Sequence, residues 1–315
     1  MGFDNTGVEL IRAAIRAAQP PAAQVPLVFL AGHTHIRTFQ RLDDDAAVLE
    51  SGRYFDTVGL ISYDPPVAPS NTWFEFQYID TTLASLQEAS RTTPDSFPTA
   101  AGAEVREKIA LVRDMFRLDE VLGCTPPGAP SRFRRASSLD QTDSLINLAL
   151  TEVFPSQIMN PPAVAGADER QIVIAGTGGI RYDIFEGEVT RDDTMIVSPF
   201  RDRFYSFTGL SAAQASGVLE AMDVFLPGDP NPLPFGSMVA TSAPDLEQPD
   251  KLYSVICLDF DLSRVRTAVQ NATADPTREE MVYRPEIDAT VVWELFASER
   301  WAQFCDNDGQ SHYQN

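Results

Sequence analysis

Residues 27–35, Leu-Val-Phe-Leu-Ala-Gly-His-Thr-His, predict a short buried strand that ends in a polar loop. The apolar run is typical of a strand covered on both faces, and Gly32 allows the backbone to bend where the strand ends. His33 and His35 are two of only three histidines in the chain. Because loops at the carboxyl ends of strands often line ligand sites, these two imidazoles can face one cavity. Neutral imidazole binds Zn, Mn or Fe, so we interpret both as metal ligands rather than as polar residues of a surface turn.

A second strand-to-loop segment lies at residues 171–181, Gln-Ile-Val-Ile-Ala-Gly-Thr-Gly-Gly-Ile-Arg. Elsewhere, short apolar or alternating runs predict strands, and apolar residues three and four positions apart predict helices. We expect strands at 46–50, 57–63, 73–79, 182–185, 194–197 and 252–258, and helices at 7–18, 101–116, 144–153 and 211–222. The predicted apolar face of the helix at 101–116 comprises Val105, Ile109, Val112 and Phe116. The pattern changes between about residues 80 and 100, which predicts a boundary between a strand-rich part and a mixed α+β part.

The composition excludes some classes of partner. The chain has 315 residues, with 24 Lys and Arg against 45 Asp and Glu, which gives a formal net charge of −21. This acidic excess argues against binding to nucleic acid or anionic lipid, because both need a basic face. No run of about eighteen apolar residues occurs, so no membrane span is expected. Three cysteines (Cys124, Cys257 and Cys305) are too few for a disulfide framework but allow one bridge.

Several motifs resemble one known family. Residues 30–35, Leu-Ala-Gly-His-Thr-His, resemble the last metal-binding motif of the calcineurin-like metallophosphoesterases. Residues 178–181 (Gly-Gly-Ile-Arg), the turn at 187–190 and Ser-Pro-Phe at 198–200 resemble the C-terminal domain of 5′-nucleotidases. Glu-Ser-Gly-Arg-Tyr at 50–54 is similar to the fungal vacuolar or secreted branch of that family. The resemblance covers nearly the whole chain, but only the final part of the family's first domain.

The resemblance implies an α+β fold. Residues 1–80 would be the C-terminal part of a calcineurin-like metallophosphoesterase domain, which is an incomplete β-sandwich segment. Residues 81–100 would be a linker, and residues 101–315 an α/β 5′-nucleotidase C-terminal-like domain. With half of the sandwich absent, the strands near 27–30 and 57–63 would expose apolar faces that partner strands normally cover.

The resemblance also implies a chemistry. In the family, two divalent metal ions (Zn, Mn or Fe) polarise a phosphate ester and activate the attacking water. His33 would bind one metal ion and His35 the other. Arg181 would pair with an anionic group of a nucleotide or other small phosphorylated substrate, and Phe200 would stack on the base. The alternatives are an ordinary surface ion pair for Arg181 and a core anchor for Phe200.

The chain departs from the family in its metal ligands. The Asp-X-His, Gly-Asp-X-X-Asp and Gly-Asn-His-Asp/Glu motifs are absent, and His312 lies in a polar tail where we expect it to be solvated. Two imidazoles cannot hold a dinuclear centre. We therefore expect a C-terminal portion of a phosphoesterase that is inactive on its own. The alternatives are a non-catalytic binding or structural module, and a mononuclear metal protein that uses the two histidines with acids such as Asp43, Asp44 and Asp45.

The nucleotide pocket departs from the family as well. Gly176 stands where the nucleotidases carry Asn, and residues 259–264 (Asp-Phe-Asp-Leu-Ser-Arg) replace a Gly-Gly-Asp-Gly-aromatic segment. An arginine is also expected just before the helix at 144–153. Arg132, Arg134 and Arg135 lie too far upstream in the sequence to be assigned that role.

The compartment is predicted only indirectly. The family resemblance implies a secretory or vacuolar route, and Asn-Ala-Thr at 271–273 fits the N-glycosylation pattern. After Met1, however, no basic segment followed by an apolar one resembles a signal peptide, which predicts a cytoplasmic location for the chain as written.

Overall fold

The computed structural model describes residues 6–19, 25–64, 73–159, 169–231, 233–234 and 236–305. The chain forms two compact units, residues 1–108 and 109–315. The division between them falls within helix α3 (Ala100–Met115), just beyond the predicted linker at 81–100. That predicted linker contains a helix of its own, α2 (Leu83–Ser90), whose first turn is capped by the Thr82 side chain.

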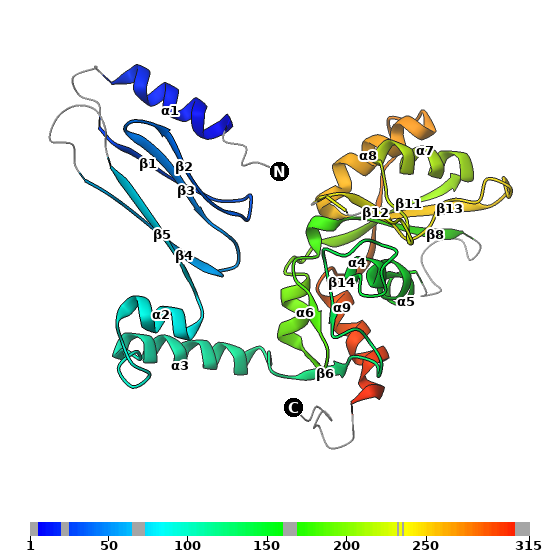
Figure 1. Ribbon diagram of the computed structural model, residues 1–315. Helices are drawn as coiled ribbons and strands as arrows, with labels where there is room; N and C mark the ends of the chain where they lie inside the picture. The colour runs from blue at the N-terminus through cyan, green and yellow to red at the C-terminus, as the bar shows by residue number, and fades with distance from the viewer. Residues whose placement is uncertain are drawn as a thin grey trace. The chain divides into compact units, whose positions relative to one another are not determined.

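The first unit combines helix α1 with two small sheets (Figure 1). Strand β3 lies in the middle of a three-stranded sheet, parallel to β1 and antiparallel to β2, while β4 and β5 pair antiparallel. Arg12 of α1 donates a hydrogen bond to Asp43 at the end of β2, over 2.7 Å, and so fastens the helix to the sheet. The elements are α1 (Thr6–Ala18), β1 (Leu27–Ala31), β2 (Arg37–Asp43), β3 (Ala46–Ser51), β4 (Thr57–Tyr63) and β5 (Phe74–Asp80).

A five-stranded sheet of order β12-β8-β13-β11-β14 forms the centre of the second unit. Strands β8 and β13 run parallel, and every other neighbouring pair is antiparallel. As a result, the carboxyl ends of β8, β13 and β14 and the amino end of β11 lie at one edge of the sheet. The strands are β8 (Arg170–Gly176), β11 (Arg203–Ser211), β12 (Met238–Ala240), β13 (Leu252–Leu258) and β14 (Met281–Asp288).

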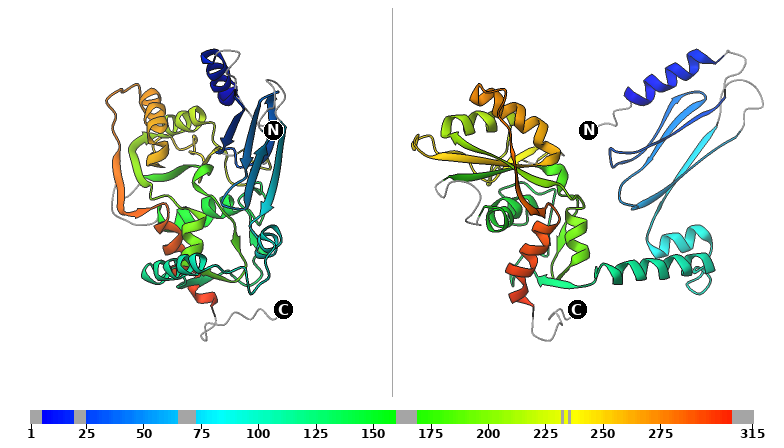
Figure 2. Two further views of the ribbon diagram at one scale, coloured as in Figure 1. Left: turned by 90° about the vertical axis from the view of Figure 1, so that its left-hand side faces the viewer. Right: turned by 180° about the vertical axis from the view of Figure 1, so that it is seen from behind.

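Helices cover both faces of this sheet (Figures 1 and 2). Along β8, Ile172 and Ile174 point to one face and Val173 and Ala175 to the other, as the two-residue repeat of a strand requires. The first face packs against α7 (Ala212–Met222) and α8 (Asp259–Thr273). The second packs against helices that include α4 (Leu145–Leu148), α5 (Phe154–Gln157) and α9 (Val291–Phe296). The sheet is therefore buried on both sides.

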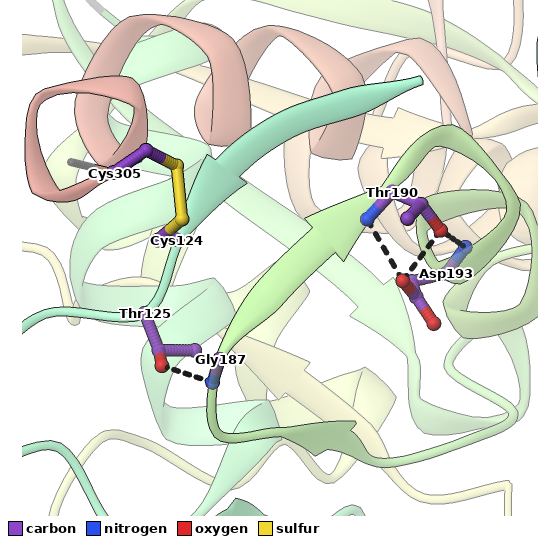
Figure 3. The surroundings of a disulfide bond; sticks show 6 residues. All are labelled: Cys124, Thr125, Gly187, Thr190, Asp193 and Cys305. Carbon is purple, nitrogen blue, oxygen red and sulfur yellow. Dashed lines mark hydrogen bonds between the residues drawn. A yellow bond between two sulfur atoms is a disulfide. The ribbon is translucent and has the colours of Figure 1, made fainter. Parts of the chain in front are cut away.

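Two short strand pairs and a disulfide complete the second unit. Strand β6 (Val121–Cys124) pairs with β10 (Glu188–Thr190), and β7 (Arg132–Phe133) pairs with β9 (Ile184–Phe185). Cys124 at the end of β6 is bonded to Cys305, which follows the last helical segment, η5 (Ala302–Phe304) (Figure 3). The one bridge that the cysteine count allows is therefore present, and Cys257 is buried and free.

The segment at 191–197 differs from its prediction. It forms helix α6 (Arg191–Val197), not a strand at 194–197. The cause is a capping box: the Asp193 N–H donates to the Thr190 hydroxyl, and the Thr190 N–H donates to the Asp193 carboxylate over 2.8 Å (Figure 3). These bonds satisfy the first turn of a helix and outweigh the strand preference of the following Ile196 and Val197.

Other predicted boundaries also move. The helix predicted at 144–153 continues through η2 (Ala149–Val153) into α5, which contains Pro155 near its start. Of the strand predicted at 182–185, only β9 forms. Strands β2, β11, β12 and β14 and helices α8 and α9 are additional elements that the sequence patterns did not indicate.

The fold class itself is confirmed as a mixture of α and β, with an α/β second unit. Within the described ranges, no helix is long and apolar enough to cross a membrane.

Candidate functional site

The loop that follows β1 has an unusual backbone. His33 has a φ of 80° and His35 a φ of 63°, so both lie in the left-handed region. Gly32 does not, which corrects the expectation that the glycine provides the bend. Histidine enters this region more readily than most side chains, but each such residue still costs about 1–3 kcal/mol. Neighbouring groups must therefore hold the loop in place.

Glu50 is the residue that holds this loop. It is the last residue but one of the central strand β3, opposite Ala31 of β1, and it is 0% exposed. The Thr34 hydroxyl donates to Glu50 Oε2 over 2.6 Å, and the His35 N–H donates to Oε1 over 2.9 Å. Charge-assisted hydrogen bonds of this kind are among the stronger ones in proteins. Both carboxylate oxygens are therefore engaged by the histidine loop.

The histidine loop does not by itself form a metal centre. His33 is exposed, and His35 is half-buried with its ring edge-on to Tyr54 at 5.4 Å. Among the residues that the structure describes, no three His, Cys, Asp or Glu side chains are grouped so that they could hold an ion. A dinuclear centre therefore does not fit the donors at this loop. His312 lies outside the described residues.

The neighbouring acidic run serves a different contact. Asp43 accepts a hydrogen bond from Arg12 over 2.7 Å and lies 3.6 Å from Arg16. Burial disfavours the charged form of Asp43, but hydrogen bonds from the Asp45 N–H and Arg12 outweigh it, so the pKa is lowered. The geometry thus gives Asp43 a partner on α1 and lends no support to a mononuclear site at this run.

The second predicted site brings Arg181 and Phe200 together. The Arg181 guanidinium carbon lies 4.9 Å from the centre of the Phe200 ring, which is within cation–π range. The Arg181 N–H donates to Val197 O over 2.7 Å, so the loop after β8 is tied to the end of α6. Phe200 is half-buried, and its carbonyl accepts a hydrogen bond from the Thr290 hydroxyl over 3.0 Å. These contacts fix a guanidinium and an aromatic ring side by side.

Arg135 lies at the same loop, although it is more than forty residues upstream in the sequence. Pairing of β7 with β9 carries the chain back to residues 183–185, and the Arg135 N–H donates to Asp183 over 2.8 Å. Its guanidinium donates to Ile180 O over 3.0 Å and to Thr177 O over 3.5 Å. A second arginine thus braces the backbone that presents Arg181. No sequence signal locates it, because its partners are more than forty residues away.

Acidic residues lie beneath the loop that follows β8. Asp261, 2% exposed in the first turn of α8, accepts the Gly176 N–H over 2.9 Å. A Cβ at position 176 would lie 3.1 Å from Asp261 Oδ2, so this packing favours glycine where the family carries Asn. At the same edge of the sheet, burial raises the pKa of Asp202 to about 6, together with a hydrogen bond to Asp259 and the charges of Asp259, Asp261 and Asp288.

Comparisons with known proteins show which chains this one resembles. Residues 132–265 match the family model of the NAD nucleotidase C-terminal domain. An uncharacterized protein of Schizosaccharomyces pombe is 26% identical over 223 residues, covering 62% of this chain and 36% of that protein. A secreted protein of Arthroderma benhamiae is 23% identical over 236 residues, covering 63% of this chain and 34% of its own length. The 5′-nucleotidase of Candida albicans superposes with a TM-score of 0.71 at 19% identity, covering 87% of this chain and 58% of that one.

The chain therefore shares the fold of the 5′-nucleotidase of Candida albicans, and residues 132–265 resemble the C-terminal domain of an NAD nucleotidase. The resemblance read from the sequence is confirmed, and its relatives are fungal. The chain spans about one third of the length of the curated relatives that it matches.

Proposed function

We propose that this chain carries the nucleotide-binding part of a metal-dependent nucleotide phosphoesterase. The observation that carries the proposal is the pairing at 4.9 Å of Arg181, on the loop after β8, with Phe200, which lies between α6 and β11. A guanidinium fork suits phosphate oxygens, and a phenyl face suits a purine or pyrimidine ring. Arg181 would bind an anionic group of the substrate, and Phe200 would stack on the base.

The local charge supports this assignment despite the net charge of −21. Arg135 and Arg181 place two cations at one loop. A small anion can therefore be held locally, although the molecule as a whole repels large polyanions. The partner that this chemistry fits is a nucleotide, not a nucleic acid.

His33 and His35 are proposed as two ligands of a divalent metal site (Zn, Mn or Fe), with Glu50 fixing the loop that presents them. Such ions, when bound, would polarise the phosphate ester. Because the described residues supply no further grouped donors, the remaining ligands would have to come from elsewhere in the polypeptide. We accordingly expect this chain alone to bind nucleotides without hydrolysing them.

Calorimetric titration with AMP, adenosine and inorganic phosphate tests the binding role. We expect Arg181→Ala to abolish the preference for AMP over adenosine, because the phosphate contact is lost. Phe200→Ala should weaken AMP and adenosine alike. Arg106→Ala, at an exposed position of α3, is the matched control and should bind like the wild type. Equal AMP affinity in the wild type and Arg181→Ala would refute the role of Arg181.

The alternative is a binding or structural module that keeps the fold without the chemistry, and the lack of a grouped metal-binding set in the described residues favours it. Incubation with Mn²⁺ or Zn²⁺ and a phosphomonoester separates the two. Turnover that disappears in His33→Ala would establish a hydrolase in this chain. If the intact gene product is also inactive and His33→Ala changes nothing, the module is the correct interpretation.

The compartment is proposed to be secretory or vacuolar. Disulfides persist in oxidising compartments, and Cys124 and Cys305 form one here. One of the relatives is itself described as a secreted protein.

A further inference from the structure

The chain contains one N-glycosylation pattern, Asn271-Ala272-Thr273, and the structure places it at the end of α8. Asn271 is exposed, and the helix stops directly after the pattern, where Ala274 takes a left-handed conformation. Ala272 faces α7, since a Cβ built on Gly217 would lie 3.6 Å from the Ala272 Cβ. The middle residue of the pattern therefore packs toward α7, while the acceptor residue Asn271 stays exposed.

The surface beside Asn271 is open. A shallow depression of about 460 Å³ lies between α7 and α8, and its lining includes Met222, Arg264, Thr267 and Asn271. It offers both aliphatic stems and hydrogen-bonding groups to the first sugars of an attached chain.

The position is also remote from the proposed nucleotide loop. Asp261, which touches Gly176, is in the first turn of α8, ten residues before Asn271. At 1.5 Å per residue this separation is about 15 Å along the helix axis. A glycan at Asn271 would therefore lie at the other end of α8 from the contact with Gly176 and would leave the loop of Arg181 accessible.

A second, independent observation points to the compartment in which such a modification occurs. The Cys124–Cys305 disulfide lies outside α7 and α8 and is expected only in an oxidising environment such as the secretory pathway. The exposed sequon and the disulfide are therefore both consistent with passage of the chain through the secretory pathway.

We propose that Asn271 is an N-glycosylation site. In the transfer, a bond forms between Asn271 Nδ2 and the anomeric carbon of a lipid-diphosphate-linked oligosaccharide. The bond from that carbon to the diphosphate oxygen breaks, the lipid diphosphate leaves with the electron pair, and the amide loses one proton. In the folded protein the Thr273 hydroxyl donates to Val269 O over 2.8 Å, so the transfer takes place on the growing chain before α8 forms.

The test uses the full chain, directed into a yeast secretory pathway by a cleavable leader and carrying a C-terminal tag with its own sequon. Wild type, Asn271→Gln, Thr273→Ala and Thr273→Ser are purified, and intact masses are compared before and after enzymatic removal of N-linked sugars. We expect wild type and Thr273→Ser to lose two glycans, and the other two variants to lose only that of the tag.

Thr273→Ser keeps both the sequon and a hydroxyl for Val269 O, so it controls for changes in the helix. Loss of the tag glycan alone from the wild type, with the Cys124–Cys305 bond formed, would overturn the proposal. Because the readout is mass, it is independent of nucleotide binding and does not depend on the proposed function.

Discussion

Glu50 determines the conformation of the histidine loop more directly than Gly32 does. Two left-handed histidines on either side of Thr34 are held because one buried carboxylate accepts from both the Thr34 hydroxyl and the His35 amide. Glu50 also pairs with Ala31 across β1 and β3, so the strand register sets its position. The consequence is that the loop geometry depends on a residue outside the Gly-His-X-His motif.

Glu50→Ala should therefore loosen this loop. The substitution leaves the Thr34 hydroxyl and the His35 N–H without their acceptor, and a buried unsatisfied group costs about 1–3 kcal/mol. We expect hydrogen exchange at His35 and in β1 to accelerate by a corresponding factor of about 5 to 150. Glu88→Ala, at an exposed position of α2, is the control and should change nothing at the loop. Unaltered exchange at His35 in Glu50→Ala would contradict the role given to Glu50.

Asp202 makes the stability of the second unit depend on pH. Its pKa is raised from 3.8 to about 6, first by burial and then by Asp259 and the other nearby acids. The folded state therefore binds this proton more tightly than the unfolded chain. The stabilisation is fully present below about pH 4 and is lost as the pH rises through about 6.

The substitution Asp202→Asn should remove the loss of stability that accompanies the rise in pH. We expect the variant to match the wild type in Tm at pH 4 and to exceed it at pH 7 to 8, because an amide stays neutral throughout. Other carboxylates act in the opposite sense: the hydrogen bond from Arg266 lowers the pKa of Glu280. The informative quantity is thus the difference in Tm between variant and wild type, followed by circular dichroism. Asp250→Asn, at an exposed position, should show no such pH-dependent difference, and a parallel curve for Asp202→Asn would refute the argument.

Elements whose signals are local could be predicted from the sequence. The strand at 171–175 and the helix at 211–222 formed as expected, because an apolar run or a capped, periodic segment carries its own information. The prediction of a strand at 194–197 was wrong because Ile196 and Val197, which follow the helix cap, favour a strand. The helix at 101–116 formed, but Val105, Ile109, Val112 and Phe116 of its predicted apolar face are all exposed. The spacing of apolar residues predicts that a helix has an apolar face, but it does not predict which element packs against that face.

The site divides in the same way. Motifs indicated His33, His35, Arg181 and Phe200 directly from the sequence. Glu50, Arg135 and Asp261 could not be found so, because their contacts span 16, 45 and 85 residues. Strand pairing and sheet order create those contacts, and neither is encoded in a short segment. The sequence motifs therefore identify the candidate groups but not the residues that position them.

The disulfide joins two elements that are 181 residues apart. Because it closes so long a loop, its removal should destabilise the second unit by about 2–5 kcal/mol. We expect Cys124→Ser/Cys305→Ser to unfold at a lower temperature than the oxidised wild type, and reductant to bring the wild type down to the level of the variant. Burial raises the pKa of Cys257, so this thiol should not exchange with the bridge. A double variant as stable as the oxidised protein would show that the bridge is not needed.

At the scale of the whole molecule, the two units differ in how much apolar surface they bury. In the described part of the first unit, the buried apolar side chains are those of Ala46, Ala47, Val48, Leu49 and Phe74. Leu30 of β1 is 79% exposed, and Leu60 and Tyr63 of β4 are also exposed. The second unit has two extensive clusters, one on each face of its sheet. Since buried apolar area is the main source of stability, the first unit should be the weaker one.

Hydrogen exchange followed by mass spectrometry should therefore report faster exchange at residues 25–63 than at residues 171–200. Strand β3 is hydrogen-bonded on both sides and should be the slowest part of the first unit, whereas β1, β2, β4 and β5 have unpaired edges or exposed apolar faces. Exposed faces of this kind also favour association, so the exchange at 25–63 should slow as protein concentration rises, while that at 171–200 stays constant. Equal protection of the two segments at low concentration would show that the first unit is stabilised by contacts other than the burial of its own side chains.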